Sequence, residues 1–241
     1  MKVRVKFRKF GPIRFIGHLD VMRFFQKAIR RSEIDIAYTG GFSPHQIMSF
    51  AAPLGVGLES NGEYMDIEVN SVSSSPDMVK RLNGASVDGI EIVDVKALPD
   101  KAGNAMASVA AAEYTVAFRE GKHPSCGSDL IKSGRQLKSF LDQEKIMITK
   151  ETKKGTMDMD LKPGIYEFSC SEEGFHMIVD ASSAGNIKPA MVIDAYLSFC
   201  EEKLLENALF ITRQDLYTRT QEGTLISLND VGSEIIPQKE A

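Results

Sequence analysis

Residues 2–31 read KVRVKFRKFGPIRFIGHLDVMRFFQKAIRR, and this stretch decides the fold of the first part of the chain. From Lys2 to Arg8, basic and apolar residues alternate strictly, which is the pattern of a strand with one buried face. Gly11–Pro12 ends that strand, and apolar residues then recur at helical spacing from about His18 to Ser32. Basic residues gather on another face of this helix: Arg23, Lys27, Arg30 and Arg31. The sequence therefore predicts a strand followed by a basic amphipathic helix.

Further elements follow along the chain in a recognisable order. Short strands are predicted at 34–38, 45–50, 63–69 and 90–96, with a helix at 76–82 that begins at Ser75–Pro76. The order strand, helix, strands, helix, strand is that of a ferredoxin-like βαββαβ unit. A second set has strands at 114–118, 145–150, 157–161, 165–170, 175–180 and 210–217, and helices at 129–141 and 189–200.

These elements predict an α+β protein of two tandem ferredoxin-like (βαββαβ-type) domains with antiparallel sheets. The first domain is expected at 1–97, a linker at 98–112, and the second domain with a C-terminal tail at 113–241. Apolar residues make up 43% of the chain, which is enough for two cores. No apolar run reaches the roughly 18 residues of a membrane span. The N-terminus does not resemble a signal peptide, so we expect a cytoplasmic protein.

Charge is distributed unevenly along the chain. Residues 1–31 hold ten Lys or Arg against one acid, a net charge of +9, whereas residues 32–241 carry a net charge of −13. Asymmetry of this size indicates an anionic partner at one end of the molecule. The cysteines Cys126, Cys170 and Cys200 are scattered and odd in number, which favours free thiols and no disulfide-linked partner. The composition indicates no cofactor.

The strongest local signals are Gly17–His18, where the basic helix begins, and the glycine-containing loop at 40–45. Glycines allow backbone N–H groups to approach a phosphate closely. Tyr38 and Phe42 offer ring faces on which bases can stack. The predicted RNA and phosphate contacts are Arg4, Arg14, Arg23, Lys27, Arg31, Tyr38, Gly41, Phe42 and Ser43.

Two histidines are candidates for acid/base chemistry. His18 and His45 could move a proton from a ribose 2′-hydroxyl, because imidazole titrates near neutrality. The alternative is that one ring caps a helix or turn while the other binds phosphate or backbone. We predict that the His18 ring lies close to the turn 42–45, and no metal site is expected.

Asp66 and Glu68 share one face of the predicted strand 63–69. Two carboxylates at this spacing can serve as acid and base. More often they pair with basic side chains on a neighbouring strand, and the alternating first strand supplies such partners.

Several segments resemble one known family, the bacterial radical-SAM-linked proteins, a domain found alone or fused after a radical S-adenosylmethionine protein. The segments that carry the resemblance are Arg14–Asp20, Ala28–Arg31, Tyr38 with Gly41–His45, Ser49–Ala51, Pro53–Val56 and Glu59–Glu68. The resemblance implies work beside a radical-SAM partner and a link to RNA metabolism. The chain itself has no Cys-x3-Cys-x2-Cys motif, so it lacks the usual ligands for a radical-SAM cluster.

We therefore predict an RNA-binding accessory protein that handles structured RNA together with a radical-SAM protein. The first alternative is a metal-independent endoribonuclease that uses His18 and His45. The second is a protein-interaction module without a nucleic-acid role, whose basic face binds an acidic partner.

Overall fold

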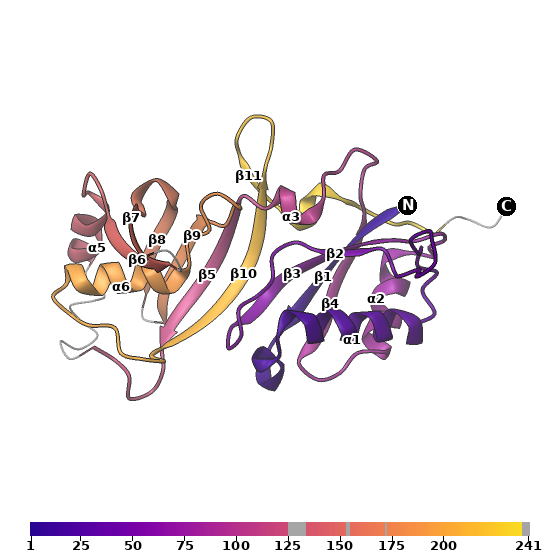
Figure 1. Ribbon diagram of the computed structural model, residues 1–241, viewed down its shortest axis with the longest axis horizontal. Coiled ribbons are helices and arrows are strands. Elements are labelled where there is room, and N and C mark those ends of the chain that lie inside the picture. Colours follow the sequence, from indigo (N-terminus) through magenta and orange to yellow (C-terminus); the bar gives the residue numbers. More distant parts are fainter. Residues whose placement is uncertain (125–133, 153–154, 172, 238–241) are drawn as a thin grey trace. The chain divides into compact units, whose positions relative to one another are not determined.

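The computed structural model describes residues 1–124, 134–152, 155–171 and 173–237 (Figure 1). The chain divides into two compact units. Unit 1 comprises Met1–Ala110 together with Arg213–Ala241, and unit 2 comprises Ala111–Thr212. The expected second domain, 113–241, therefore differs from unit 2, because the structure places the residues from Arg213 onward in unit 1.

Unit 1 is a mostly antiparallel sheet with helices. Its elements are β1 (Lys2–Lys9), η1 (Gly11–Phe15), α1 (His18–Arg31), β2 (Met48–Phe50), β3 (Glu59–Glu68), α2 (Ser75–Gly84), β4 (Ile90–Ala97), α3 (Ala105–Ser108), β10 (Leu209–Arg219) from Arg213 onward, β11 (Leu225–Ser227), η3 (Leu228–Val231) and β12 (Ser233–Glu234). The strands lie in the order β12-β4-β1-β3-β10, with β2 paired to β3 and β11 to β10.

The two faces of this sheet have different chemistry. Val3, Val5 and Phe7 of β1 are buried together with Phe25 of α1 and Leu82 of α2, because alternate strand positions point to the same side. The other side of β1 carries basic residues, and the segment 227–229 lies over it: the Leu228 carbonyl accepts from Arg4, and the Ser227 hydroxyl forms a hydrogen bond with that of Tyr64 on β3. The sequence prediction of one apolar face on β1 is confirmed.

Unit 2 contains antiparallel strands and a separate hairpin. Its elements are β5 (Ala111–Phe118), α5 (Gly134–Leu141), β6 (Met147–Thr152), β7 (Gly155–Asp160), η2 (Lys162–Gly164), β8 (Ile165–Ser171), β9 (Gly174–Asp180), α6 (Pro189–Phe199) and the first residues of β10. β9 lies between β5 and β8, and β6 pairs with β7. The core is aromatic: Phe168 stacks on Phe175 with ring centroids 5.6 Å apart, and Phe140 meets Tyr196 at 5.2 Å.

The architecture is thus a mixed α and β one with mostly antiparallel pairing, as predicted at that level. The expected strand 34–38 is reduced to isolated bridges, Ile36 with Val69 and Tyr38 with Gln46. Residues 129–133 of the expected helix 129–141, and Cys126, lie outside the described residues. Across the described ranges, no helix has both the length and the apolar character needed to cross a membrane.

Candidate functional site on unit 1

Arg4 does not face solvent, contrary to its predicted role as an RNA contact. Its Nε and Nη2 atoms donate to the two carboxylate oxygens of Asp66 at 2.7 and 2.9 Å, and Nη1 donates to the Leu228 carbonyl at 3.0 Å. Only 2% of the Arg4 side chain is exposed. The cross-strand interpretation of Asp66 is therefore the one that the structure shows, and a phosphate has no access to Arg4.

Two further cations on the basic side of β1, Lys6 and Arg8, are also paired. Lys6 Nζ lies 3.2 Å from Asp215 Oδ2, and Arg8 Nη1 lies 2.8 Å from Glu91 Oε2. The Tyr64 hydroxyl donates to Asp215, and burial together with the Asp215 charge raises the pKa of Tyr64. Arg4 and Lys6 are thus paired within the protein, whereas the Arg8–Glu91 pair lies at the surface.

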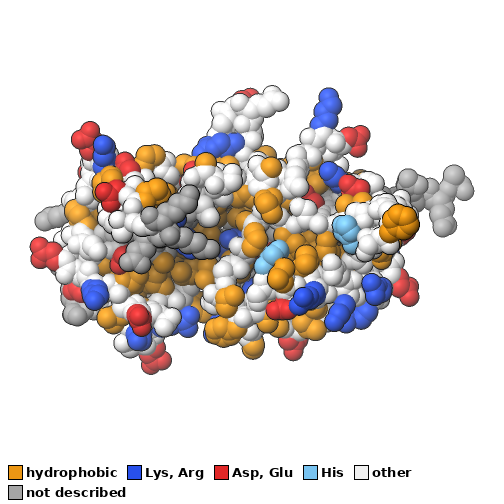
Figure 2. Space-filling view, in the orientation of Figure 1, with side chains coloured by type: hydrophobic (Ala, Val, Ile, Leu, Met, Phe, Trp, Pro, Cys, Tyr) orange, Lys and Arg blue, Asp and Glu red, His pale blue; other side chains and the backbone are white. Residues whose placement is uncertain are grey.

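Helix α1 carries the solvent-facing positive charge instead. Exposed cations run along it: Arg23, Lys27, Arg30 and Arg31. Figure 2 shows Lys and Arg side chains gathered over α1. Arg23 lies 3.4 Å from the exposed Asp20 carboxylate, and Arg31 donates to the Ala85 carbonyl at 2.8 Å. Exposed pairs of this kind are weak, so these side chains remain accessible to a larger anion.

The loop 38–45 presents aromatic rings beside this helix. Gly41 has φ +100°, a conformation that side chains resist and that lets the loop reverse. Phe42 is fully exposed, and Tyr38 is 49% exposed. Gln46, just after the loop, donates through Nε2 to the Gln26 carbonyl of α1 at 3.2 Å.

The hydrogen bond from Gln46 to Gln26 fixes where the loop 38–45 lies along α1. Arg23 and Arg30 are three residues before and four residues after Gln26, so all three share one side of the helix. The base of the loop therefore lies next to the exposed cations. Gly41 and Ser43 are also exposed in this loop. The predicted contacts Tyr38, Gly41, Phe42 and Ser43 are all exposed in this loop, whose base lies beside Gln26 of α1.

The two histidines lie apart, contrary to the prediction that His18 approaches the turn 42–45. The His18 ring packs edge-on against Phe50 with centroids 5.0 Å apart. His45 Nδ1 lies 3.1 Å from Thr39 Oγ1 at the base of the loop, whose anchor is Gln26. Gln26 is eight residues along α1 from His18, a rise of about 12 Å. The separation arises because the chain after the loop runs back along α1, from Gln46 beside Gln26 to Phe50 beside His18.

His18 instead lines a small pocket that sequence analysis missed. The pocket is closed by Lys9, His18, Phe50, Leu54 and Glu63, among others, and its volume of about 10 Å³ suits one water molecule. These residues come from the segments that carry the family resemblance, with the exception of Lys9. The start of α1 and the segment 50–54 therefore meet at one point of unit 1.

Lys9 is the unexpected member of this pocket. Its Nζ donates to the Ile16 carbonyl at 2.8 Å, and burial lowers the pKa of this amine while the Glu63 charge opposes that change. Glu63 also accepts from Arg213 Nη1 at 2.8 Å. The sequence held a signal for this: Lys9 continues the alternate positions Val3, Val5 and Phe7, which form the buried face of β1.

Arg14 is partly withdrawn from solvent as well. Its Nη1 atom lies 2.8 Å from Glu59 Oε1, and the pair is mostly covered. The guanidinium also lies 4.8 Å from the Phe15 ring centroid. Among the described residues, no three His, Cys, Asp or Glu side chains gather as metal ligands would.

Unit 1 is therefore an α+β unit with a cationic helix, an exposed aromatic loop and a small polar pocket at the start of that helix. The chain belongs to the family described as uncharacterized proteins conserved in bacteria (DUF2344), whose model matches residues 2–189. The match includes α1, the loop 38–45 and the pocket around His18. Comparison with curated proteins finds no match.

Proposed function

We propose that this protein binds structured RNA through unit 1 and presents it to a radical-SAM partner. The observation that carries the RNA proposal is the fully exposed Phe42, held on a loop whose base is anchored to the cationic helix α1. A phenyl ring that is entirely in water has a free face, and beside a cationic helix that face can stack on an unpaired base.

The two halves of this surface complement the two parts of a nucleotide. Arg23, Lys27 and Arg30 offer charge to phosphates, and Tyr38 and Phe42 offer faces to bases that are not paired. Stacking of this kind contributes about 1–3 kcal/mol per base. Unpaired bases beside a helical stem, as in a folded RNA, match this arrangement.

Two finer parts of the proposal rest on other support. The strand order β4-β1-β3, with β2 on the far side of β3, is that of a βαββαβ unit, and β5-β9-β8 with β10 beside β5 repeats it. Tandem ferredoxin-like domains are therefore part of the proposal. The radical-SAM partner rests on the resemblance of the segments around His18 and the loop 38–45. In this scheme the partner performs the radical step and this chain holds the RNA.

The test measures RNA affinity as a function of salt. Fluorescence anisotropy with labelled bulk tRNA, from 50 to 300 mM salt, gives the slope of log affinity against log salt. The variant Arg23→Glu/Lys27→Glu/Arg30→Glu should reduce this slope by about 2, since each phosphate contact contributes about 0.7–0.9. The matched control, Lys101→Glu/Lys122→Glu/Lys203→Glu, makes the same charge change at exposed positions elsewhere and should retain the slope.

Phe42→Ser separates stacking from charge. This variant should weaken binding about fivefold or more at every salt concentration without altering the slope, since it removes a ring and no charge. If both charge variants lost RNA affinity equally, net charge alone would explain the loss, and the proposed surface would be contradicted. No binding by the unaltered protein at 50 mM salt would exclude RNA and favour a protein partner.

A further inference from the structure

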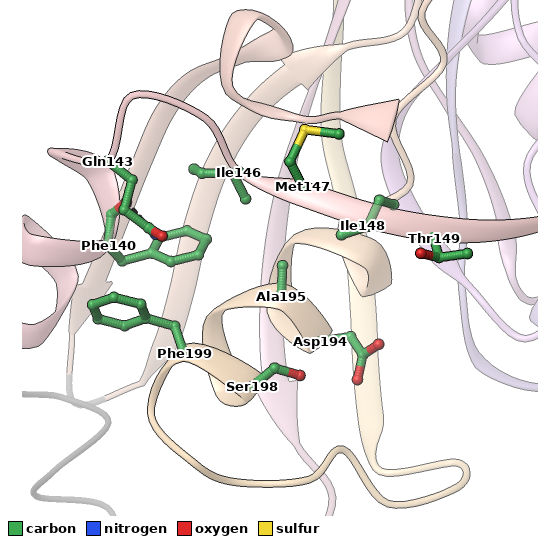
Figure 3. A pocket seen from close by; sticks show the side chains of 10 residues that line it. All are labelled: Phe140, Gln143, Ile146, Met147, Ile148, Thr149, Asp194, Ala195, Ser198 and Phe199. Atoms are coloured by element: carbon green, nitrogen blue, oxygen red, sulfur yellow. Dashed lines mark hydrogen bonds between the residues drawn. The ribbon is translucent and has the colours of Figure 1, made fainter. Parts of the chain in front are cut away.

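We propose that unit 2 carries a binding pocket for a small organic cation, an amine with an aromatic or aliphatic body. The pocket has a volume of about 370 Å³ and lies between α5, β6 and α6 (Figure 3). This volume falls in the range of about 300–1,000 Å³ that is usual for small-molecule sites. The proposal concerns unit 2 alone and is independent of RNA binding by unit 1.

One wall of the pocket is polar and comes from α6. Asp194 and Ser198 are one helical turn apart, so both side chains lie on the same face of α6, and both line the pocket (Figure 3). The neighbouring Ile193 and Leu197 point into the core. In the described part of the chain, neither the Asp194 carboxylate nor the Ser198 hydroxyl makes a hydrogen bond or ion pair. Both therefore remain available to a ligand.

The remaining walls are largely apolar. Ile146 and Met147 lie on the β6 side, and Phe140 meets Phe199 edge-on with ring centroids 5.7 Å apart. Met147 is 55% exposed, and a thioether beside aromatic rings adapts readily to ligands of different shape. An apolar part of a ligand that binds here would be removed from water and would pack against these side chains.

Charge then selects among ligands with such a body. A positive head near Asp194 is attracted by its carboxylate. An anionic head would be repelled by the same carboxylate. Unit 2 as a whole holds twelve basic and sixteen acidic residues, so its overall field also favours a cation. An amine with an apolar body is the ligand class that satisfies both walls.

The test uses the full chain with methyl-labelled methionine and two probes of the same shape. Tryptamine carries an ammonium group, and tryptophol carries a hydroxyl in its place. Titration followed by NMR should move the Met147 methyl signal, identified through Met147→Leu, and tryptamine should bind about fivefold more tightly than tryptophol. That ratio is the size expected of one exposed charge pair.

Variants then locate the interaction. Asp194→Asn should weaken tryptamine binding about fivefold and leave tryptophol unchanged, whereas the matched control Glu206→Gln, at an exposed position outside the pocket, should change neither. Ala195→Phe should fill the pocket and abolish binding while the other methionine signals stay in place. Equal affinity for the two probes, an unchanged affinity in Asp194→Asn, or shifts confined to methionines other than Met147 would each overturn the proposal.

Discussion

Replacing Arg4 with methionine tests how much unit 1 depends on the buried ion pair between Arg4 and Asp66. The guanidinium makes two bonds to Asp66 and one to the Leu228 carbonyl, all shielded from water. Arg4→Met keeps much of the side-chain volume but leaves the Asp66 carboxylate buried without its cation. Removing one partner of a buried pair costs about 3–5 kcal/mol, and we expect that loss in the free energy of unfolding of unit 1.

The double variant gives the matched control. In Arg4→Met/Asp66→Leu neither charge remains, and two apolar side chains take the place of the pair. Such replacements are often neutral, and the main residual cost is the Leu228 carbonyl that loses its donor, about 1–2 kcal/mol. The two single variants together would cost about 6–10 kcal/mol if they acted independently. A coupling of several kcal/mol is therefore expected.

Methyl signals in a urea titration can follow each unit separately. Met65 is buried in β3 of unit 1 and Met177 in β9 of unit 2, and the chain has no tryptophan to serve instead. The Met65 transition should move in Arg4→Met and largely recover in the double variant, while the Met177 transition reports on unit 2. Additive losses, or a loss below about 1 kcal/mol in Arg4→Met, would refute the reasoning.

Two further predictions concern β3. Burial and the charge of Asp215 raise the pKa of Tyr64 in the folded protein. Because the unfolded chain loses this proton above a pKa of about 10, the stabilisation by Tyr64 is complete below about pH 10 and declines as the pH rises further. Tyr64→Phe should flatten the fall of the urea midpoint of unit 1 above pH 10, and an identical slope would count against this explanation. A Cβ at Gly62 would lie 2.6 Å from the Gln214 carbonyl oxygen, so Gly62→Ala should destabilise unit 1 by about 1–3 kcal/mol. A Cβ at Gly84 would meet open space, so Gly84→Ala should stabilise unit 1 by about 0.5 kcal/mol in the same titration. Equal effects of Gly62→Ala and Gly84→Ala would contradict the close approach of Gln214 to Gly62.

Local patterns predicted most elements of the chain. The alternation from Lys2 to Arg8 marks β1, and the apolar spacing after His18 marks α1, whose observed end at Arg31 is one residue from the predicted one. Both patterns depend on residues only two to four positions apart, so a sequence shows them directly. The pairing of Asp66 with β1 was also predictable, because neighbouring strands bring opposite charges together.

Contacts between residues far apart in the sequence could not be predicted from these local patterns. Nothing near Arg4 reveals that Leu228 covers it, since that contact joins residues 224 positions apart. For the same reason, local patterns do not show that the residues from Arg213 onward group with the first 110 residues. The separation of His18 from His45 depends on how the strand after the loop runs along α1, which is a tertiary relation and not a spacing.

The division of unit 1 into two stretches of chain has a consequence for biosynthesis. A ribosome delivers the first 110 residues, then all of unit 2, and only afterwards the residues from Arg213 that belong beside β3. At about 5–20 residues per second, unit 2 occupies the ribosome for on the order of 5–20 s. During that interval the part of β3 around Gly62 lacks its β10 neighbour and is an open strand edge, which other chains can pair with. That edge therefore stays open to pairing with other chains until the residues from Arg213 emerge.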